Sequence, residues 1–142
     1  MLAPLFFIHI PKTAGTSFRT ALEQSFGSSF VYADYGHQAH ETSDVVRTYV
    51  YESKDLDGLY AHTTKDPRRR AALAGHVHFD RYSPIFPLVN TVTFVREPLS
   101  RLVSEYKHFC RHKGFDATLR EFMLKDRAIN MQARYLKHAP LS

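Results

Sequence analysis

The 142-residue sequence lacks most features of secreted and membrane-spanning proteins. It contains a single cysteine, Cys110, so no internal disulfide can form, and a reducing, cytoplasmic compartment is the expectation. No apolar run approaches the ~20 residues that a membrane-spanning helix requires, so we expect no membrane span. The apolar segment 2–10 lacks a basic start and is interrupted by Pro4 and His9, which argues against a signal peptide.

The composition is that of an ordinary globular protein, with 44% apolar and 23% charged residues. We expect residues 1–142 to form one domain. The formal charge is +5, and nine histidines can add positive charge. A basic chain favours an anionic ligand, but the same charge also serves solubility, so charge alone does not decide between them. The aromatic residues follow core spacings rather than forming a stacking platform, which argues against nucleic acid as a partner.

Short apolar segments alternate with helical patterns along the chain. The expected strands cover residues 5–10, 30–33, 73–77 and 90–95. The expected helices cover residues 17–26, 68–72, 98–113, 118–123 and 128–137. Residues 36–65 show neither periodicity and stay unassigned. The alternation predicts an α/β fold of three layers, with helices on both faces of a central parallel sheet.

The helix expected at 98–113 carries an apolar stripe that we expect to face the core. This stripe comprises Leu99, Leu102, Val103, Tyr106, Phe109 and Cys110. Arg101 lies four residues from both Glu97 and Glu105, a spacing that predicts ion pairs along the helix. The next helix opens with a capping box, because Thr118 precedes Glu121 by three residues.

Residues 11–17 read Pro-Lys-Thr-Ala-Gly-Thr-Ser and join a strand to a helix. The backbone N–H groups at a helix N-terminus have no partner within the helix and can bind anions. This loop offers the ammonium of Lys12, the hydroxyls of Thr13, Thr16 and Ser17, and space beside the small residues Ala14 and Gly15. In a nucleoside-triphosphate loop the lysine follows the glycine, whereas here it comes first, which argues against a triphosphate.

Open parallel sheets bind ligands at the carboxyl ends of their strands, and three candidate groups follow predicted strands. The first is the loop with Lys12, and the second is Gly75-His76-Val77. The third is Arg96, followed by Ser104 in the next helix. Because three strand ends carry polar groups, we expect one shared site there.

In this order, the three groups resemble the carbohydrate sulfotransferases of the heparan-sulfate 2-O type and their bacterial relatives. The matching segments are His9–Ser17, Gly75–Val77 and Thr93–Ser104, with a further similar segment at Asn130–Leu136. The resemblance covers residues 5–136 and implies a P-loop NTPase-like sulfotransferase fold. Family members usually continue beyond the last segment. We therefore expect a compact variant, a fragment, or a protomer that completes its site in a homo-oligomer.

The resemblance also implies an activity and a role for each matching residue. The donor would be 3′-phosphoadenosine 5′-phosphosulfate (PAPS), the product 3′-phosphoadenosine 5′-phosphate (PAP), and the acceptor a carbohydrate hydroxyl. The donor's 5′-phosphosulfate would be held by Lys12, Thr13, Ala14, Gly15, Thr16 and Ser17. Arg96 and Ser104 would hold its 3′-phosphate. His76 would be the general base, and no metal would be required.

The residue types suit this chemistry. A lysine at the leaving phosphate stabilises charge that grows in the transition state. A neutral imidazole is a suitable base for an alcohol and contributes about 10²–10⁴-fold. Taken singly, each residue also has a structural explanation: Lys12 as a solvated loop residue, His76 as a hydrogen-bonded histidine, and Arg96 as a partner of Glu97.

Other charged and reactive residues are interpreted as structural. His9 lies in an apolar strand, and His78 competes with His76 but falls outside the matching tripeptide. Residues 68–70 are all arginine and are expected to form a solvated run; the alternative is that they attract a polyanionic acceptor. Cys110 is assigned to packing.

Two other functions compete with sulfonate transfer. A small kinase would need an acidic residue for Mg²⁺ at a strand end, where this chain has Arg96. A non-catalytic module that binds a nucleotide or polyanion is the stronger alternative, because the chain is short. The animal relatives carry a Golgi membrane anchor, so the Golgi lumen is the alternative to the cytoplasm for a chain that has lost its anchor.

Overall fold

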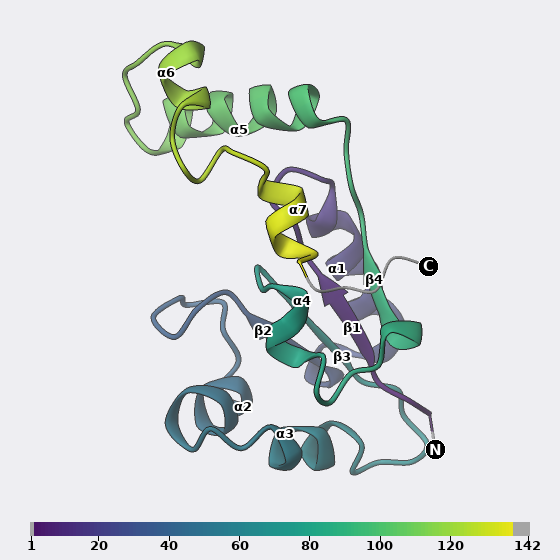
Figure 1. Ribbon diagram of the computed structural model, residues 1–142. Coiled ribbons are helices and arrows are strands. Elements are labelled where there is room, and N and C mark those ends of the chain that lie inside the picture. Colours follow the sequence, from purple (N-terminus) through teal and green to yellow (C-terminus); the bar gives the residue numbers. More distant parts are fainter. Residues whose placement is uncertain (1, 138–142) are drawn as a thin grey trace.

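The computed structural model describes residues 2–137 and centres on a sheet of four parallel strands (Figure 1). The strands are β1 (Leu5–Ile8), β2 (Val31–Asp34), β3 (Ala72–Gly75) and β4 (Thr91–Thr93). Their order is β2-β3-β1-β4, and every pair is parallel. All four predicted strands are present, with boundaries that differ by up to two residues. The carboxyl ends of the strands therefore lie at one edge of the sheet.

Helices cover both faces of the sheet, which confirms the three-layer α/β fold. On one face α1 (Gly15–Phe26) packs Leu22 against Phe7 of β1. The neighbouring residue Phe6 enters the core on the other face. That face is covered by α2 (Asp44–Val46), a π-helix (Arg47–Glu52), α3 (Leu56–Thr63) and α4 (Phe79–Tyr82). Alternate residues of β1 thus enter different cores, as in a strand buried on both faces.

The unassigned segment 36–65 is mostly helical. Val46 of α2 and Leu59 of α3 are fully buried in the core below β1. Between them lies the π-helix, which has neither the 3.6-residue repeat of an α-helix nor the two-residue repeat of a strand. This insertion explains why no clean period is visible in the sequence.

The helix predicted at residues 68–72 is wrong, because the chain makes a turn there. The Asp66 carboxylate accepts a hydrogen bond from the Arg68 N–H at 3.0 Å, and the Asp66 carbonyl accepts one from Arg69 at 3.2 Å. Arg70 donates to the Ala3 carbonyl at 2.9 Å. The arginine run therefore lies before β3, at the end of the sheet opposite the carboxyl edge.

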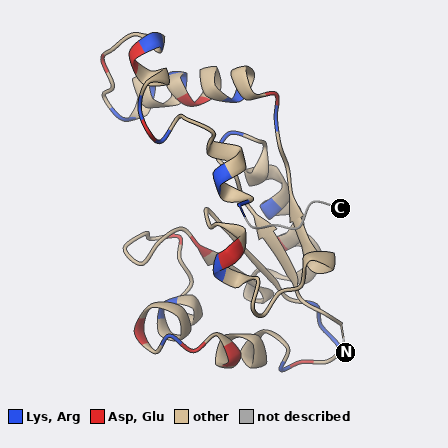
Figure 2. Cartoon of the chain, viewed as in Figure 1, with Lys and Arg blue, Asp and Glu red and all other residues tan. Residues whose placement is uncertain are grey.

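The remaining helices are α5 (Pro98–His112), α6 (Leu119–Met123) and α7 (Met131–Tyr135). Short 3₁₀ turns cover Ser28–Phe30 and Leu88–Asn90. In Figure 1, α5 and α6 project beyond the carboxyl edge of the sheet, and α7 lies between them and the sheet. Figure 2 shows that the strands are largely uncharged and that charged residues lie on the surrounding helices and loops. No helix within residues 2–137 is long and apolar enough to cross a membrane.

Helix α5 begins and ends close to its predicted bounds, but the predicted burial of its apolar stripe is wrong at both ends of the stripe. Leu99 is 56% exposed and Cys110 is exposed. The buried residues of α5 are Arg101 and Glu105, whose side chains form the predicted ion pair at 2.9 Å. Glu97 does not pair with Arg101; its carboxylate caps the helix instead, accepting from the Leu99 and Ser100 N–H groups. The middle of the stripe, formed by Leu102, Val103, Tyr106 and Phe109, is half-buried. Tyr106 and Phe109 pack on the buried Phe122 of α6 instead of on the sheet.

The last two predicted helices are present but differ in length. The capping box of α6 is confirmed, because the Thr118 hydroxyl accepts from the Glu121 N–H and the Glu121 carboxylate accepts from the Thr118 N–H. The helix predicted at 128–137 is restricted to the five residues of α7, which begins after Asn130 in a left-handed conformation. Residue 131, a methionine, is buried.

Candidate active site

The loop between β1 and α1 has the backbone shape of an anion site. Lys12 and Ala14 both have φ of 67°, in the left-handed region that few residues other than glycine adopt. Ala14 is the N-cap of α1 and makes no side-chain hydrogen bond to the first turn, so it leaves the helix N–H groups open to a ligand. Left-handed residues in such loops turn successive N–H groups toward one point, a geometry that binds anions.

Two contacts hold this loop in place. The Thr13 hydroxyl donates to the Ile10 carbonyl at 2.8 Å, so its hydrogen serves the loop rather than a ligand, contrary to expectation. The buried ring of His9 packs against Gly15, where any Cβ would overlap the ring. Gly15 is thus required for α1 to begin beside β1, in addition to leaving space for an anion.

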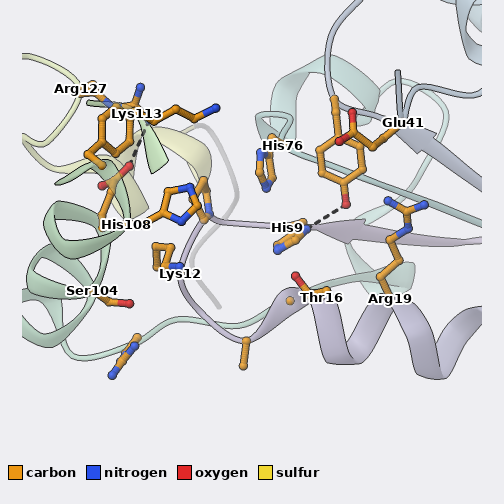
Figure 3. Close-up of a pocket in the computed structure, with 17 residues that line it drawn as sticks. His9, Lys12, Thr16, Arg19, Glu41, His76, Ser104, His108, Lys113 and Arg127 are labelled. Carbon is orange, nitrogen blue, oxygen red and sulfur yellow. Dashed lines mark hydrogen bonds and ion pairs between the residues drawn. The ribbon is translucent and has the colours of Figure 1, made fainter. Parts of the chain in front are cut away.

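A cavity of about 840 Å³ opens at the carboxyl edge of the sheet, between this loop and α5 (Figure 3). We call it the first cavity. The predicted site residues on its lining are Lys12, Ala14, Gly15, Thr16, His76, Arg96 and Ser104. Thr13, which is buried, and Ser17, which is exposed, are not on the lining. The structure therefore brings the three predicted groups together around one space.

The first cavity is positively charged. Five of the side chains lining it are Lys or Arg, and two are Glu. Figure 3 shows Lys12, Ser104, His108, Lys113 and Arg127 on one side of the space and His76, His9, Arg19 and Glu41 on the other. The excess of positive charge lies on the side of Lys12, Lys113 and Arg127, and it favours an anionic ligand in the cavity.

His76 follows β3 and lies among other rings. Its ring centroid is 4.6 Å from that of His9 and 4.7 Å from that of Tyr35, with edge-to-face geometry. Tyr35 and His9 are themselves joined by a 3.0 Å hydrogen bond between the Tyr35 hydroxyl and His9 Nδ1. The His76 side chain is exposed to the cavity, but burial by the surrounding protein and the neighbouring His9 lower its pKa from 6.5 to about 4. The imidazole is therefore neutral at pH 7.

Gly75 sets the position of His76. A Cβ at this glycine would collide with the backbone carbonyl of Asp34 in the neighbouring strand β2. The two strands approach closely only because residue 75 has no side chain. His76 therefore leaves the sheet at a point fixed by two packed backbones.

Arg96 is held through its backbone by a residue of α7. The side-chain amide of Gln132 accepts from the Arg96 N–H at 2.8 Å and donates to the Arg96 carbonyl at 2.8 Å. These two hydrogen bonds connect the segment after β4 to α7. They involve only the Arg96 backbone, so the guanidinium does not take part in this contact. It also gives a physical role to the segment 130–136, whose sequence suggested no chemistry of its own.

Ser104 and His108 face the cavity from α5, whose position depends on a buried charge network. The Glu105 carboxylate is paired with Arg101 at 2.9 Å and with Arg127 at 3.1 Å. Arg101 also donates to the Met131 sulfur at 3.1 Å. The network thus links α5, α7 and the segment between α6 and α7. Two of its members, Glu105 and Arg127, also line the first cavity beside Ser104.

Sequence reasoning missed several residues on the lining. Tyr35 follows β2, so the rule about strand carboxyl ends could have identified it. Glu41, Lys113 and Arg127 come from irregular segments that carry no periodic signal. Burial and the neighbouring Lys12 lower the pKa of His108, which turns toward the loop. Among residues 2–137 there is no cluster of three or more His, Cys, Asp or Glu side chains suited to hold a metal ion.

The geometry defines an α/β protein with a cationic cavity at the carboxyl edge of a parallel sheet. The profile of the sulfotransferase family matches residues 3–139, which is nearly the whole chain. The protein therefore belongs to the sulfotransferase family, and sulfonate transfer is the activity that this membership supports. No curated protein and no solved structure gives a match to the chain.

Proposed function

We propose that this protein transfers a sulfonate group from PAPS to a hydroxyl group of a carbohydrate, with His76 as the general base. The observation that carries the proposal is the cationic first cavity, which joins Lys12 and the loop to His76 and to Arg96 with Ser104. Family membership supports sulfonate transfer in general. The identity of the donor, the acceptor and the base is our inference from the site.

The two anionic ends of PAPS suit two parts of the cavity. The loop amides at residues 14–16 and the Lys12 ammonium would bind the 5′-phosphosulfate. Arg96 and Ser104, which line the same cavity, would bind the 3′-phosphate, which Arg can contact through two parallel hydrogen bonds. Lys113 and Arg127 add positive charge to the same space.

The reaction is an in-line displacement at sulfur. As the acceptor oxygen bonds to sulfur, the bond from sulfur to the bridging phosphate oxygen breaks, and PAP leaves. The Lys12 ammonium stabilises the negative charge that grows on the bridging oxygen. The acceptor proton passes to His76, which is neutral at pH 7 and has a free electron pair for it. A bound anionic donor raises the pKa of His76 and so makes it a stronger base.

The direct test is incubation with ³⁵S-labelled PAPS and a panel of glycans. We expect label to be transferred to at least one glycan. Lys12→Ala and His76→Ala should each lower the rate by about 10²–10⁴-fold. The matched variants Lys65→Ala and His40→Ala change exposed residues outside the lining and should leave the rate unchanged.

PAP binding separates the competing functions. A protein that binds PAP but transfers no label to any glycan would be a binding module. A protein that fails to bind PAP would contradict both readings. ATP hydrolysis dependent on Mg²⁺ would instead indicate the kinase alternative.

A further inference from the structure

A second cavity, of about 340 Å³, opens beside the first at the carboxyl ends of β2 and β3. Its lining includes Asp34, Tyr51, His78, Asp80 and Arg81. Tyr35 and His76 line both cavities and therefore lie where the two cavities meet. His76 is thus accessible from two spaces, one over β1 and β4 and the other over β2 and β3.

The two cavities differ in charge. Lys and Arg outnumber Glu in the first cavity by five to two. The second cavity has one Arg and two Asp on its lining. An anionic group is therefore attracted to the first cavity and gains no such attraction in the second. Ligands of different charge would be sorted between the two sides of His76.

The charged groups of the second cavity are held in fixed positions. The Asp34 carboxylate is fully buried and accepts from the hydroxyls of Tyr51 and Tyr82, each at 2.6 Å. It also forms an ion pair with Arg81 Nε at 3.0 Å. The Arg81 guanidinium lies over the Tyr51 ring, 4.8 Å from its centroid, while 36% of the side chain remains exposed. The cavity therefore has a rigid polar floor, of the kind that orients a ligand through hydrogen bonds.

We infer that the second cavity binds the acceptor, and that the part bound there is an uncharged, hydroxyl-rich group such as a sugar ring without carboxylate or sulfate. The inference rests on the proposed function, because it takes His76 as the base. In an in-line displacement the acceptor oxygen approaches sulfur from the side opposite the leaving phosphate oxygen. With the donor on the loop of the first cavity, the acceptor enters from beyond His76, where the second cavity lies. Arg81 and Asp80 then donate and accept hydrogen bonds with sugar hydroxyls.

The charge of the acceptor can be tested with matched sugars. The probes are the methyl glycosides of glucose, galactose and mannose, each compared with its uronate, which differs only by a carboxylate. Protein with ¹⁵N-labelled histidine is saturated with PAP and titrated with each probe at low ionic strength. We expect at least one neutral glycoside to shift the ring signals of both His76 and His78 saturably. Its uronate should bind at least about fivefold more weakly.

Substitution of Asp80 tests the cause of this preference. Asp80→Asn keeps the shape of the side chain and removes one negative charge, so the difference between neutral glycoside and uronate should fall to about twofold. Asp116→Asn makes the same change at an exposed position outside both cavities and should leave the preference intact.

Each outcome bears on one of the two proposals. Uronates that bind as tightly as the neutral glycosides would overturn the inferred charge of the acceptor. PAP binding without any shift of His76 and His78 by the glycosides would overturn the second cavity as the acceptor site. Failure to bind PAP would instead overturn the proposed donor, and with it the acceptor role of this cavity, even if a glycoside bound.

Discussion

The sheet and the segment α5–α7 form opposite walls of the first cavity, but different interactions hold them. The sheet with its loop and His76 rests on two apolar cores, in which Phe6 and Phe7 are fully buried. The α5–α7 segment has few buried apolar residues and is held by the Arg101–Glu105 pair and the Gln132 amide. The comparison shows that the proposed base rests on a packed frame, whereas Arg96 and Ser104 rest on polar contacts.

This difference has a consequence for function. Apolar burial is non-directional, so small changes in geometry leave most of the free energy that stabilises the sheet in place. Buried ion pairs and hydrogen bonds depend on geometry and cost most when one partner is lost. We therefore expect substitutions in the α5–α7 segment to change binding of the donor before they unfold the sheet.

The largest effect on stability is expected from the apolar core. Phe6 packs edge-to-face on Tyr82 at 5.5 Å and beside Phe86 at 5.7 Å. Phe6→Ala should lower the free energy of unfolding by about 3–5 kcal/mol in urea titrations. The matched control is the exposed Leu99 of α5. Leu99→Ala should change the free energy of unfolding by less than about 0.5 kcal/mol. Similar losses for both would contradict the contrast between the two walls.

Loss of Arg101 should have the next largest effect. Arg101→Met leaves the buried Glu105 carboxylate with Arg127 as its remaining ion-pair partner and should cost about 3 kcal/mol. Amide hydrogen exchange should become faster in α5–α7, while β1 and β3 keep their protection. The double variant with Glu105→Leu removes the buried carboxylate that has lost its buried partner and should recover part of the loss. Equal loss of protection in the sheet would show that the two walls unfold together.

A smaller effect is expected from Gln132. Gln132→Ala removes both hydrogen bonds to the Arg96 backbone and should weaken PAP binding about tenfold, with a loss of about 1 kcal/mol in stability. The expected change is a higher KM for PAPS with little change in kcat, because Gln132 positions a binding residue. Gln24→Ala, on the exposed side of α1, is the matched control. A fall in kcat at unchanged PAP affinity would argue against this role.

The last prediction concerns the pH dependence of stability, which depends on the titration of His76. Its pKa is about 4 in the folded protein and about 6.5 in an unfolded chain. Between these values the unfolded chain binds a proton that the folded protein does not, so the free energy of unfolding falls as the pH is lowered from 6.5 to 4. His76→Gln should make this fall shallower in urea titrations at pH 7 and pH 5. An identical fall in both proteins would show that His76 does not have a lowered pKa.

Much of the sheet and of the loop could be predicted from the sequence, because local patterns encode them. The apolar run of β1 and the small residues Ala14 and Gly15 each determine the structure of their own segment of the chain. The position of Cys110 was predicted wrongly, because a helical stripe shows which residues share a face but not what that face contacts. Asp66 resembles a helix cap, yet the same carboxylate also closes a turn.

Parts of the site could not be predicted because they depend on contacts between distant residues. Arg96 and Gln132 are joined across 36 positions, and Tyr82 and Asp34 across 48. His76 borders both cavities because the strand order places β3 between β2 and β1. The periodicity of one segment does not indicate which distant residues it will contact.

The central claim is that the first cavity binds a nucleotide with phosphates at both ends. Calorimetric titration with PAP and with adenosine 5′-phosphate, which lacks the 3′-phosphate, tests it most directly. We predict that the protein binds PAP more tightly, and that Arg96→Ala weakens PAP binding by at least about tenfold while leaving adenosine 5′-phosphate within about twofold. Equal affinity for the two nucleotides, or an equal loss for both in the variant, would contradict the account.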